Sequence, residues 1–209
     1  CSFGLWSWVC RVLHYSLRRQ RQMCIIGESR SKETGAHVKR VSIISEALAL
    51  SIGLSPEQAE IIRYASPLHD VGKIAIPDHI LNNPGKLEGN DWEVMKSHAQ
   101  IGAQILSQSP QIIFQVAAKI AGGHHERWDG KGYPQGLAGT DISIEARIVA
   151  LADVFDALGS KRCYKEAWSN EAIKNFIIEQ IGQMFDPMIA DALIEQFDFF
   201  VNIRVENPD

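Results

Sequence analysis

The chain has 209 residues, of which 45% are hydrophobic and 22% charged, and its formal net charge is −4. This length supports one well-buried domain and leaves little for a second. The negative balance argues against general binding of nucleic-acid polymers, because such binding needs a broad positive surface. The negative charge of an anionic substrate would therefore have to be neutralised at the binding site, by metal ions and a few Lys or Arg side chains.

The cysteines and the hydropathy bear on the compartment. Cys1, Cys10, Cys24 and Cys163 show no CxxC spacing, which is typical of free thiols in a reducing compartment and not of a disulfide framework. No run approaches the ~18 apolar residues that a membrane span needs. We therefore expect a cytoplasmic protein, or the cytoplasmic part of a membrane-attached one.

Residues 1–30 differ from the rest of the chain in composition and in the order of apolar and charged residues. An apolar stretch with two tryptophans precedes three arginines within residues 18–21, the reverse of the charge order in a signal peptide. We interpret this segment as a helical stub or linker, with an interfacial helix as the alternative. Because the first residue is Cys, we expect a missing upstream sensory or receiver region, followed by one domain over residues 31–209. A homodimer or a partner signalling protein stays open.

From about residue 30 onward, apolar residues recur at helical spacing. The run that starts at residue 37 predicts a first helix that ends near Gly53. Ser55 as N-cap and Pro56 at the first helical position begin a second helix, with His69 and Asp70 near its end. Residues 75–92 predict a loop rich in Pro, Asn and Gly, which is too long for a minimal connector.

The remaining segments are also helical, apart from a second irregular loop over residues 128–143. The predicted helices cover residues 93–106, 112–126, 145–160, 170–184 and 187–197. The sequence shows no alternating strand pattern and no internal repeat. It therefore predicts an all-α fold, a helical bundle with two long loops at one end.

Histidines and carboxylates gather at the ends and faces of these helices. Neutral imidazole and ionised carboxylate are ligands for divalent metals, and helical bundles build metal sites from inward side chains of facing helices. A single histidine is more often a hydrogen-bonded, half-buried ring, but the set together predicts a polynuclear centre. The candidates are His37, His69, His98, His124 and His125, with Glu33, Asp70 and Asp153.

We also assign expected roles to Lys73 and Gly72 of the HDVGK motif. Lys73 follows Asp70 by three residues and is expected on the same face. It is either an ordinary surface lysine or a group that neutralises a phosphate oxygen or protonates a leaving alkoxide. Gly72 would let substrate or a neighbouring helix approach closely. His14 and His79 are expected to be ordinary surface or loop residues.

HDVGK at residues 69–73 resembles the HD superfamily of metal-dependent phosphohydrolases. HHERWDGKGYP at residues 124–134, together with RIVALADVFDAL and KRCYK, makes the chain similar to the HD-GYP subgroup, the bacterial cyclic di-GMP phosphodiesterases. The resemblance runs from about Glu33 to Pro187. It implies an HD-type bundle with its loops over the metal centre, and hydrolysis of the 3′–5′ bonds of cyclic di-GMP to linear pGpG, with further cleavage to GMP left open.

The resemblance also implies roles for single residues. Asp70 would be the bridging metal ligand and, with Lys73, a catalytic residue. Gly132 and Pro134 would shape the loop, since Gly allows positive φ and Pro fixes its own. The implied metal ligands are Glu33, His37, His69, Asp70, His98, His124, His125 and Asp153, and the implied substrate contacts are Lys73, Tyr133, Arg162 and Lys165.

Two or three divalent ions are expected, and the presence of Glu33 favours three. A ligand set without thiolates suits iron first and manganese second. The chain departs from the family at Ser143 and Cys163, where proline is usual. The second departure bears on the loop that carries Arg162, and so on substrate affinity more than on metal binding. Two alternatives stay open: a phosphodiesterase for cyclic GMP-AMP, and a catalytically weak module that binds a nucleotide or a partner protein.

Overall fold

The computed structural model describes residues 35–160 and 167–208. Over these ranges it contains helices and no strand, apart from one isolated bridge between Ile181 and Phe185, which confirms the predicted all-α class. The predicted stub at residues 1–30 and the candidates Glu33, Arg162 and Lys165 lie outside the described residues, as does Cys163. The elements are α2 Gly35–Ser51, α3 Pro56–Ala65, η1 Ser66–Leu68, η2 Val71–Ala75, α4 Asp78–Leu81, α5 Gly89–Ser107, α6 Ile112–Gly123, η3 Gly139–Asp141, α7 Ile144–Gly159, α8 Asn170–Gln180, α9 Pro187–Glu195 and α10 Phe197–Glu206.

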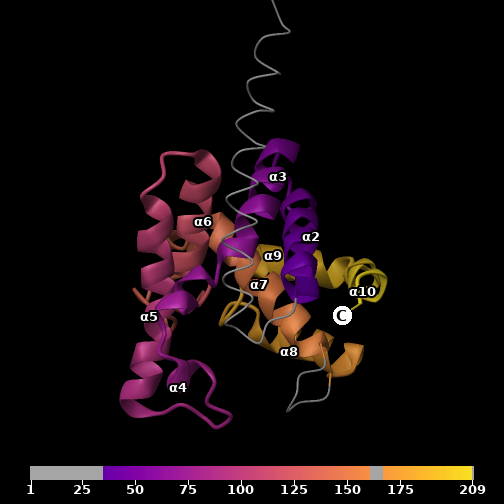
Figure 1. Ribbon diagram of the computed structural model, residues 1–209. Helices are drawn as coiled ribbons and strands as arrows, with labels where there is room; N and C mark the ends of the chain where they lie inside the picture. Colours follow the sequence, from indigo (N-terminus) through magenta and orange to yellow (C-terminus); the bar gives the residue numbers. More distant parts are fainter. Residues whose placement is uncertain (1–34, 161–166, 209) are drawn as a thin grey trace, which may run out of the picture.

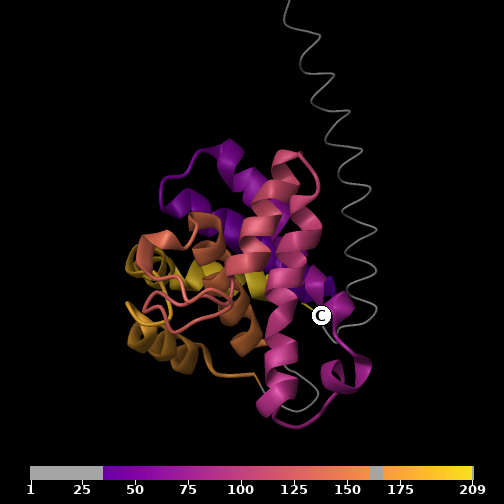
Figure 2. The ribbon, with the colours of Figure 1, turned by 90° about the vertical axis from the view of Figure 1, so that its left-hand side faces the viewer.

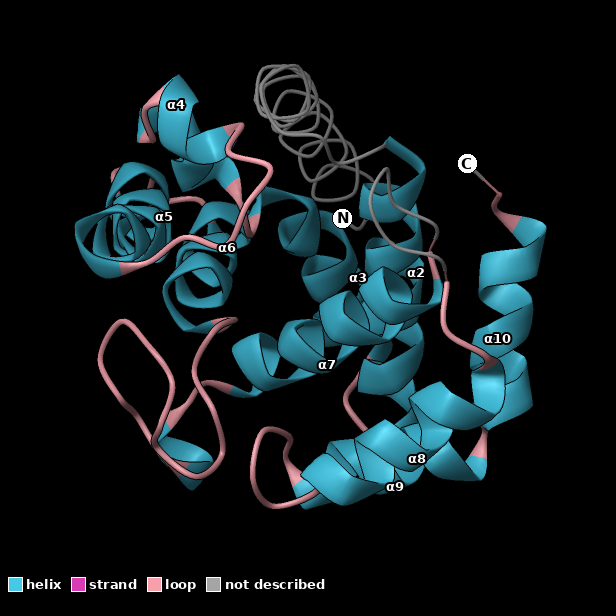
Figure 3. Ribbon diagram, turned by 90° about the horizontal axis from the view of Figure 1, so that it is seen from below, coloured by secondary structure: helices cyan, strands magenta, loops and turns pink. Residues whose placement is uncertain are grey.

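The core lies where α2, α3, α6 and α7 meet. Helix α2 packs against α3 and α7, and α6 packs against α3, α5 and α7. Val41, Ile44 and Leu48 recur at helical spacing on α2 and are fully buried, as is Phe155 on α7. Figure 1 and Figure 3 show the α5–α6 pair on one side of this centre and helices α8, α9 and α10 on the other.

Helix α3 begins as predicted and ends earlier. The Ser55 hydroxyl accepts a bond from the Gln58 backbone at 3.2 Å, and the Gln58 side chain accepts one from the Ser55 backbone at 3.0 Å, which is a complete capping box. The helix ends at Ala65, and the chain continues in 3₁₀ turns, the first of which contains Pro67. The prediction that His69 and Asp70 end an α-helix is therefore wrong: they lie between η1 and η2.

The HD turn, residues 69–73, packs closely against α5. A Cβ atom added to Gly72 would lie 1.9 Å from the carbonyl oxygen of His98 and 2.6 Å from the backbone nitrogen of Gly102. Only glycine allows this approach, so the expectation that Gly72 admits a neighbouring helix is confirmed. Figure 2 shows α5 as the long magenta helix that runs along this side of the molecule.

The two long loops and the C-terminal region differ in detail from the prediction. The first loop contains the short helix α4, and α5 begins at Gly89. Helix α10 was not predicted, because its run of β-branched and aromatic residues has low helix propensity. It forms because Phe197, Phe200 and Ile203 bury one face in the core. None of the helices in the described part of the chain is long and apolar enough to cross a membrane.

Candidate metal centre

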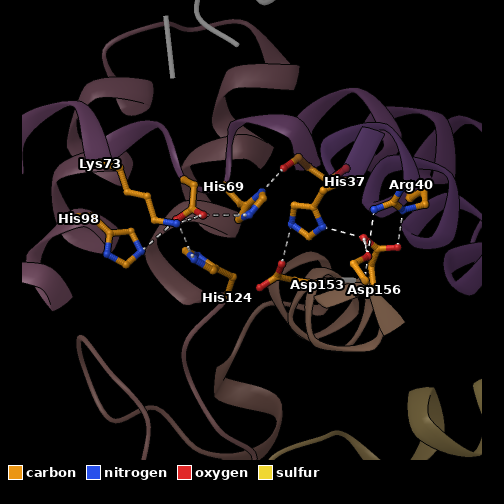
Figure 4. Close-up of polar contacts among 11 residues, drawn as sticks. His37, Arg40, His69, Lys73, His98, His124, Asp153 and Asp156 are labelled. Atoms are coloured by element: carbon orange, nitrogen blue, oxygen red, sulfur yellow. Dashed lines mark hydrogen bonds and ion pairs between the residues drawn. The ribbon is translucent and has the colours of Figure 1, made fainter. Parts of the chain in front are cut away.

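The structure brings the candidate ligands that it describes into two adjacent groups. Within each group, donor atoms lie within 4.8 Å of one another. The groups form where α2, the HD turn, α5, the end of α6 and α7 converge, and Figure 4 shows His37 and Asp153 on one side of His69, with His98 and His124 on the other. The first group is Asp70, His98, His124 and His125, and the second is His37, His69 and Asp153.

Asp70 belongs to the first group and also contacts the second. Its Oδ1 is 3.2 Å from Nε2 of His98 and 3.7 Å from Nε2 of His124. Its Oδ2 is 3.3 Å from Nε2 of His69, in the other group. Because its two oxygens face different groups, the carboxylate has the geometry to bridge two ions.

The backbone orients three of the imidazole rings. Nδ1 of His69, His98 and His124 lies 2.8, 2.7 and 3.0 Å from the carbonyl oxygen three residues earlier in the chain. A ring that donates from Nδ1 to a carbonyl keeps its Nε2 lone pair for a metal. In all three rings, Nε2 is the atom that faces Asp70.

The donor atoms of the first group fit a divalent metal ion. Within the described part of the chain, Nε2 of His98, Nε2 of His124 and Oδ1 of Asp70 are buried and make no hydrogen bond. They lie close together without hydrogen-bond geometry. Burying such atoms without a partner costs free energy, and a metal ion coordinated by all three would remove that cost.

The electrostatics of the first donor group also favour metal binding. Burial alone would raise the pKa of Asp70, but the positive charge of Lys73 and the neighbouring His69 and His124 rings hold it well below its usual range, so the carboxylate is ionised. The Lys73 ammonium lies 2.6 Å from Oδ2 of Asp70. Burial lowers the pKa of His124 and of His125, which keeps both rings neutral and able to coordinate.

Two carboxylates contact His37, Asp153 at Nε2 and Asp156 at the opposite ring nitrogen, Nδ1. Nε2 of His37 is 3.2 Å from Oδ1 of Asp153, and its Nδ1 is 2.7 Å from Oδ2 of Asp156. Nε of Arg40 donates to the other oxygen of Asp156 at 2.7 Å. Burial lowers the pKa of His37, but the two carboxylates outweigh it and raise the pKa to about 10, so a metal ion that binds this ring would have to displace a proton. A carboxylate behind a metal-ligating histidine fixes the orientation of the ring.

Asp156 and Arg40 were missed by the sequence analysis. Asp156 follows Asp153 by three residues, so both project from the same face of α7, and this spacing was the available signal. Arg40 gave none, because its partner is 116 residues away in the chain. Both side chains are almost completely buried.

Glu126, the third residue of the HHE motif, anchors the loop of residues 128–143. Its buried carboxylate accepts hydrogen bonds from the backbone nitrogens of Gln135 at 2.7 Å and Leu137 at 3.1 Å. Glu126 is in neither group of candidate ligands. Glu126 therefore holds the loop in place through these hydrogen bonds, a role that the sequence analysis did not assign.

The GYP residues bring the same loop against the histidine pair. A Cβ atom on Gly132 would lie 2.4 Å from the backbone nitrogen of Arg127, so this glycine permits close approach. The expected use of positive φ at Gly132 is wrong, since that conformation occurs at other glycines of the loop. The Tyr133 ring stacks on His125 at a centroid distance of 4.7 Å, and a cis peptide bond joins Tyr133 to Pro134.

Comparison with known proteins agrees with the fold and the motifs. The family model described as "HD domain" matches residues 22–189. The 3′3′-cGAMP-specific phosphodiesterase 2 of Vibrio cholerae is 51% identical over 182 residues, which are 87% of this chain and 35% of that protein. The cyclic di-GMP phosphodiesterase response regulator RpfG of Xanthomonas campestris is 52% identical over 167 residues, 80% of this chain and 44% of that protein. The chain thus spans less than half the length of these two relatives.

A solved structure extends the comparison to the fold. Bd1817, an HDG"Y"P protein from Bdellovibrio bacteriovorus, superposes with a TM-score of 0.59 at 24% identity, covering 78% of this chain and 51% of that one. At this identity the likeness concerns the fold alone. With the family match over most of its length, the chain belongs to the HD domain family, and its HHE and GYP motifs place it among the HD-GYP proteins.

Proposed function

We propose that the chain is a metal-dependent phosphodiesterase domain that hydrolyses the 3′–5′ bonds of cyclic di-GMP to linear pGpG. The observation that carries this proposal is the pair of largely buried donor groups, which Asp70 of the first group joins through its contact with His69 of the second, next to the GYP loop. The substrate class is supported by relatives named as cyclic di-GMP phosphodiesterases, which are 42–52% identical to this chain.

The proposed ligand sets follow the two groups. Asp70 would bridge two ions, one held further by His98, His124 and His125, and the other by His37, His69 and Asp153. Glu33 is the proposed additional ligand for a third ion. Donors that are all imidazole or carboxylate favour iron first and manganese second over a thiolate-bound zinc site. Bound divalent ions would activate a water molecule and neutralise charge on the phosphate.

The chain's own residues would bind the substrate and manage the proton. Water would attack the phosphorus and release one proton to the solvent, the bond to the 3′-oxygen would break, and that oxygen would take up one proton, so that OH and H are added across the broken bond. Lys73 is partly exposed beside Asp70 and would stabilise a phosphate oxygen or supply that proton. Burial, and next the charge of Asp70, raise the pKa of Tyr133, so its hydroxyl stays protonated and can donate to a phosphate. Arg162 and Lys165 complete the proposed substrate contacts.

A second candidate substrate is 3′3′-cyclic GMP-AMP. The V. cholerae relative that is 51% identical is named for that specificity. A module that only binds the nucleotide or a partner protein is less favoured, because the candidate ligands that the structure describes gather into two donor groups. The proposal also places this domain at residues 31–209, in the cytoplasm, behind an upstream sensory or receiver region. Assembly as a homodimer or with a partner signalling protein remains compatible with it.

Turnover by the purified chain tests the proposal. The protein is isolated without oxygen and loaded with iron or manganese, and cyclic di-GMP and 3′3′-cyclic GMP-AMP are each followed by chromatography. We expect pGpG from the parent, loss of turnover in Asp70→Ala, and parent activity in His79→Ala, which changes a histidine of α4 outside both donor groups. No turnover by the metal-loaded parent, or an unimpaired Asp70→Ala variant, would contradict the proposal. Much faster cleavage of cyclic GMP-AMP would make it the main substrate.

A further inference from the structure

A row of aromatic rings leads from the surface of α5 to the first donor group. Trp92, in the first turns of α5, is 41% exposed. Its ring meets the edge of Tyr133 at a centroid distance of 6.0 Å, and Tyr133 stacks on His125 at 4.7 Å. We call Trp92, Tyr133 and His125 the aromatic row. An exposed aromatic side chain is ordinary when it stands alone, but Trp92 continues a row of ring contacts that ends on a candidate metal ligand.

A cation lies beside the outer two rings of the aromatic row. Lys96 follows Trp92 by four residues, so both share one face of α5. Its ammonium lies 6.0 Å from the ring centroid of Trp92 and 5.9 Å from that of Tyr133. Glu93 pairs with it at 2.8 Å and leaves further N–H donors available, since an ammonium carries three.

We propose that Trp92 and Lys96 form a guanine subsite for one base of the cyclic dinucleotide. This inference rests on the proposed function and adds a specificity determinant to it. A purine stacks readily on an aromatic ring next to a cation. Guanine offers two acceptors, O6 and N7, to a lysine at its edge, whereas adenine presents an amino donor beside N7. The subsite therefore accepts cyclic di-GMP and cyclic GMP-AMP, each of which has a guanine, and disfavours cyclic di-AMP.

Binding and kinetics of Trp92 variants test the stacking part. Loss of one base stack weakens binding by about tenfold, so Trp92→Ala should raise KM for cyclic di-GMP by that factor, with kcat and metal content close to the parent values. It should also raise the Kd for a non-hydrolysable phosphorothioate analogue of cyclic di-GMP. Trp92→Phe, which keeps a stacking ring, should retain most of the affinity. Ile105→Ala, which removes a similarly exposed apolar side chain from the same helix, is the matched control.

Base preference tests the part played by Lys96. We expect Lys96→Met to lower the preference for cyclic di-GMP over cyclic di-AMP, measured as the ratio of Kd values, without loss of metal. If Trp92→Ala left the Kd unchanged, or raised it no more than Ile105→Ala does, the subsite would be overturned even if the parent hydrolyses cyclic di-GMP. Binding that depends on Trp92 in a parent without turnover would support the subsite and contradict the phosphodiesterase proposal alone. A parent that neither binds nor cleaves the dinucleotide contradicts both.

Discussion

Replacing Asp156 by Asn should weaken one half of the proposed metal centre and the fold around it. The Asp156 side chain is completely buried and holds His37 and Arg40, each at 2.7 Å. Asn keeps the size of Asp but has one acceptor oxygen and an amide group that donates. One of the two donors would then face another donor in the protein interior.

The size of the effect follows from this burial. Breaking a buried ion pair by removing one partner costs about 3–5 kcal/mol, and we expect about 3 kcal/mol here because Asn can still accept one hydrogen bond. Loss of an outer-shell partner of a metal-ligating histidine typically lowers metal affinity by roughly 10- to 100-fold. We expect this loss for the ion at His37, His69 and Asp153, while the ion at the other donor group keeps its affinity.

Two measurements separate these effects. Urea denaturation of the chelator-treated protein gives the change in the free energy of unfolding, and competition with a chromogenic chelator gives the affinity for each ion. Glu46→Gln is the matched control, because Glu46 pairs with Arg63 at the surface, where that arginine side chain is 45% exposed, and such pairs contribute at most about 1 kcal/mol. If Asp156→Asn matched this control in both measurements, Asp156 would have no supporting role.

Three further perturbations have distinct expected results. Gly72→Ala should lower the free energy of unfolding, measured by urea denaturation, by about 1–3 kcal/mol, because the new methyl group meets the His98 backbone. Gly85→Ala, whose methyl group would meet only a side-chain oxygen at 3.3 Å, should keep the stability of the parent. Equal stability of the two variants would contradict the close packing of Gly72 against α5. Glu126→Gln should speed limited proteolysis within residues 128–143 at unchanged metal content, because the Glu126 carboxylate accepts two hydrogen bonds from the backbone of that loop. An unchanged cleavage rate would contradict the view that Glu126 anchors the loop. Chelation should abolish turnover while far-UV circular dichroism persists, because the apolar core is formed by other residues; loss of helix on chelation would show that the metals hold the fold.

The sequence was sufficient for features that depend on local pattern. Helical spacing indicated the fold class, the capping box at Ser55 is a local signature, and adjacent His-Asp and His-His pairs marked candidate ligands that the structure brings together. Features that depend on distant partners were not predictable. Arg40 meets Asp156 only because α2 packs on α7. Helix α10 forms against its propensity through burial of Phe200 and its neighbours.

The same distinction explains the errors at single residues. Pro67 was an available sign that α3 would end before the HD pair, because a proline inside a helical pattern ends the helix. That the chain continues in 3₁₀ turns depends on how those residues pack, which the pattern does not show. Gly132 was expected to need positive φ, whereas the nearby backbone of Arg127 is what requires a glycine there. A motif therefore identifies a constrained position, but the kind of constraint depends on the tertiary contacts.

The proposed bridging of two ions by Asp70 can be tested directly by extended X-ray absorption fine structure on the iron- or manganese-loaded chain. Two ions joined by one carboxylate should give metal–metal scattering at about 3.5–4 Å, and this signal should disappear in Asp70→Ala while imidazole scattering remains. A fully loaded parent protein without a metal–metal signal, or a variant that keeps it, would contradict the bridged pair on which the proposed chemistry depends.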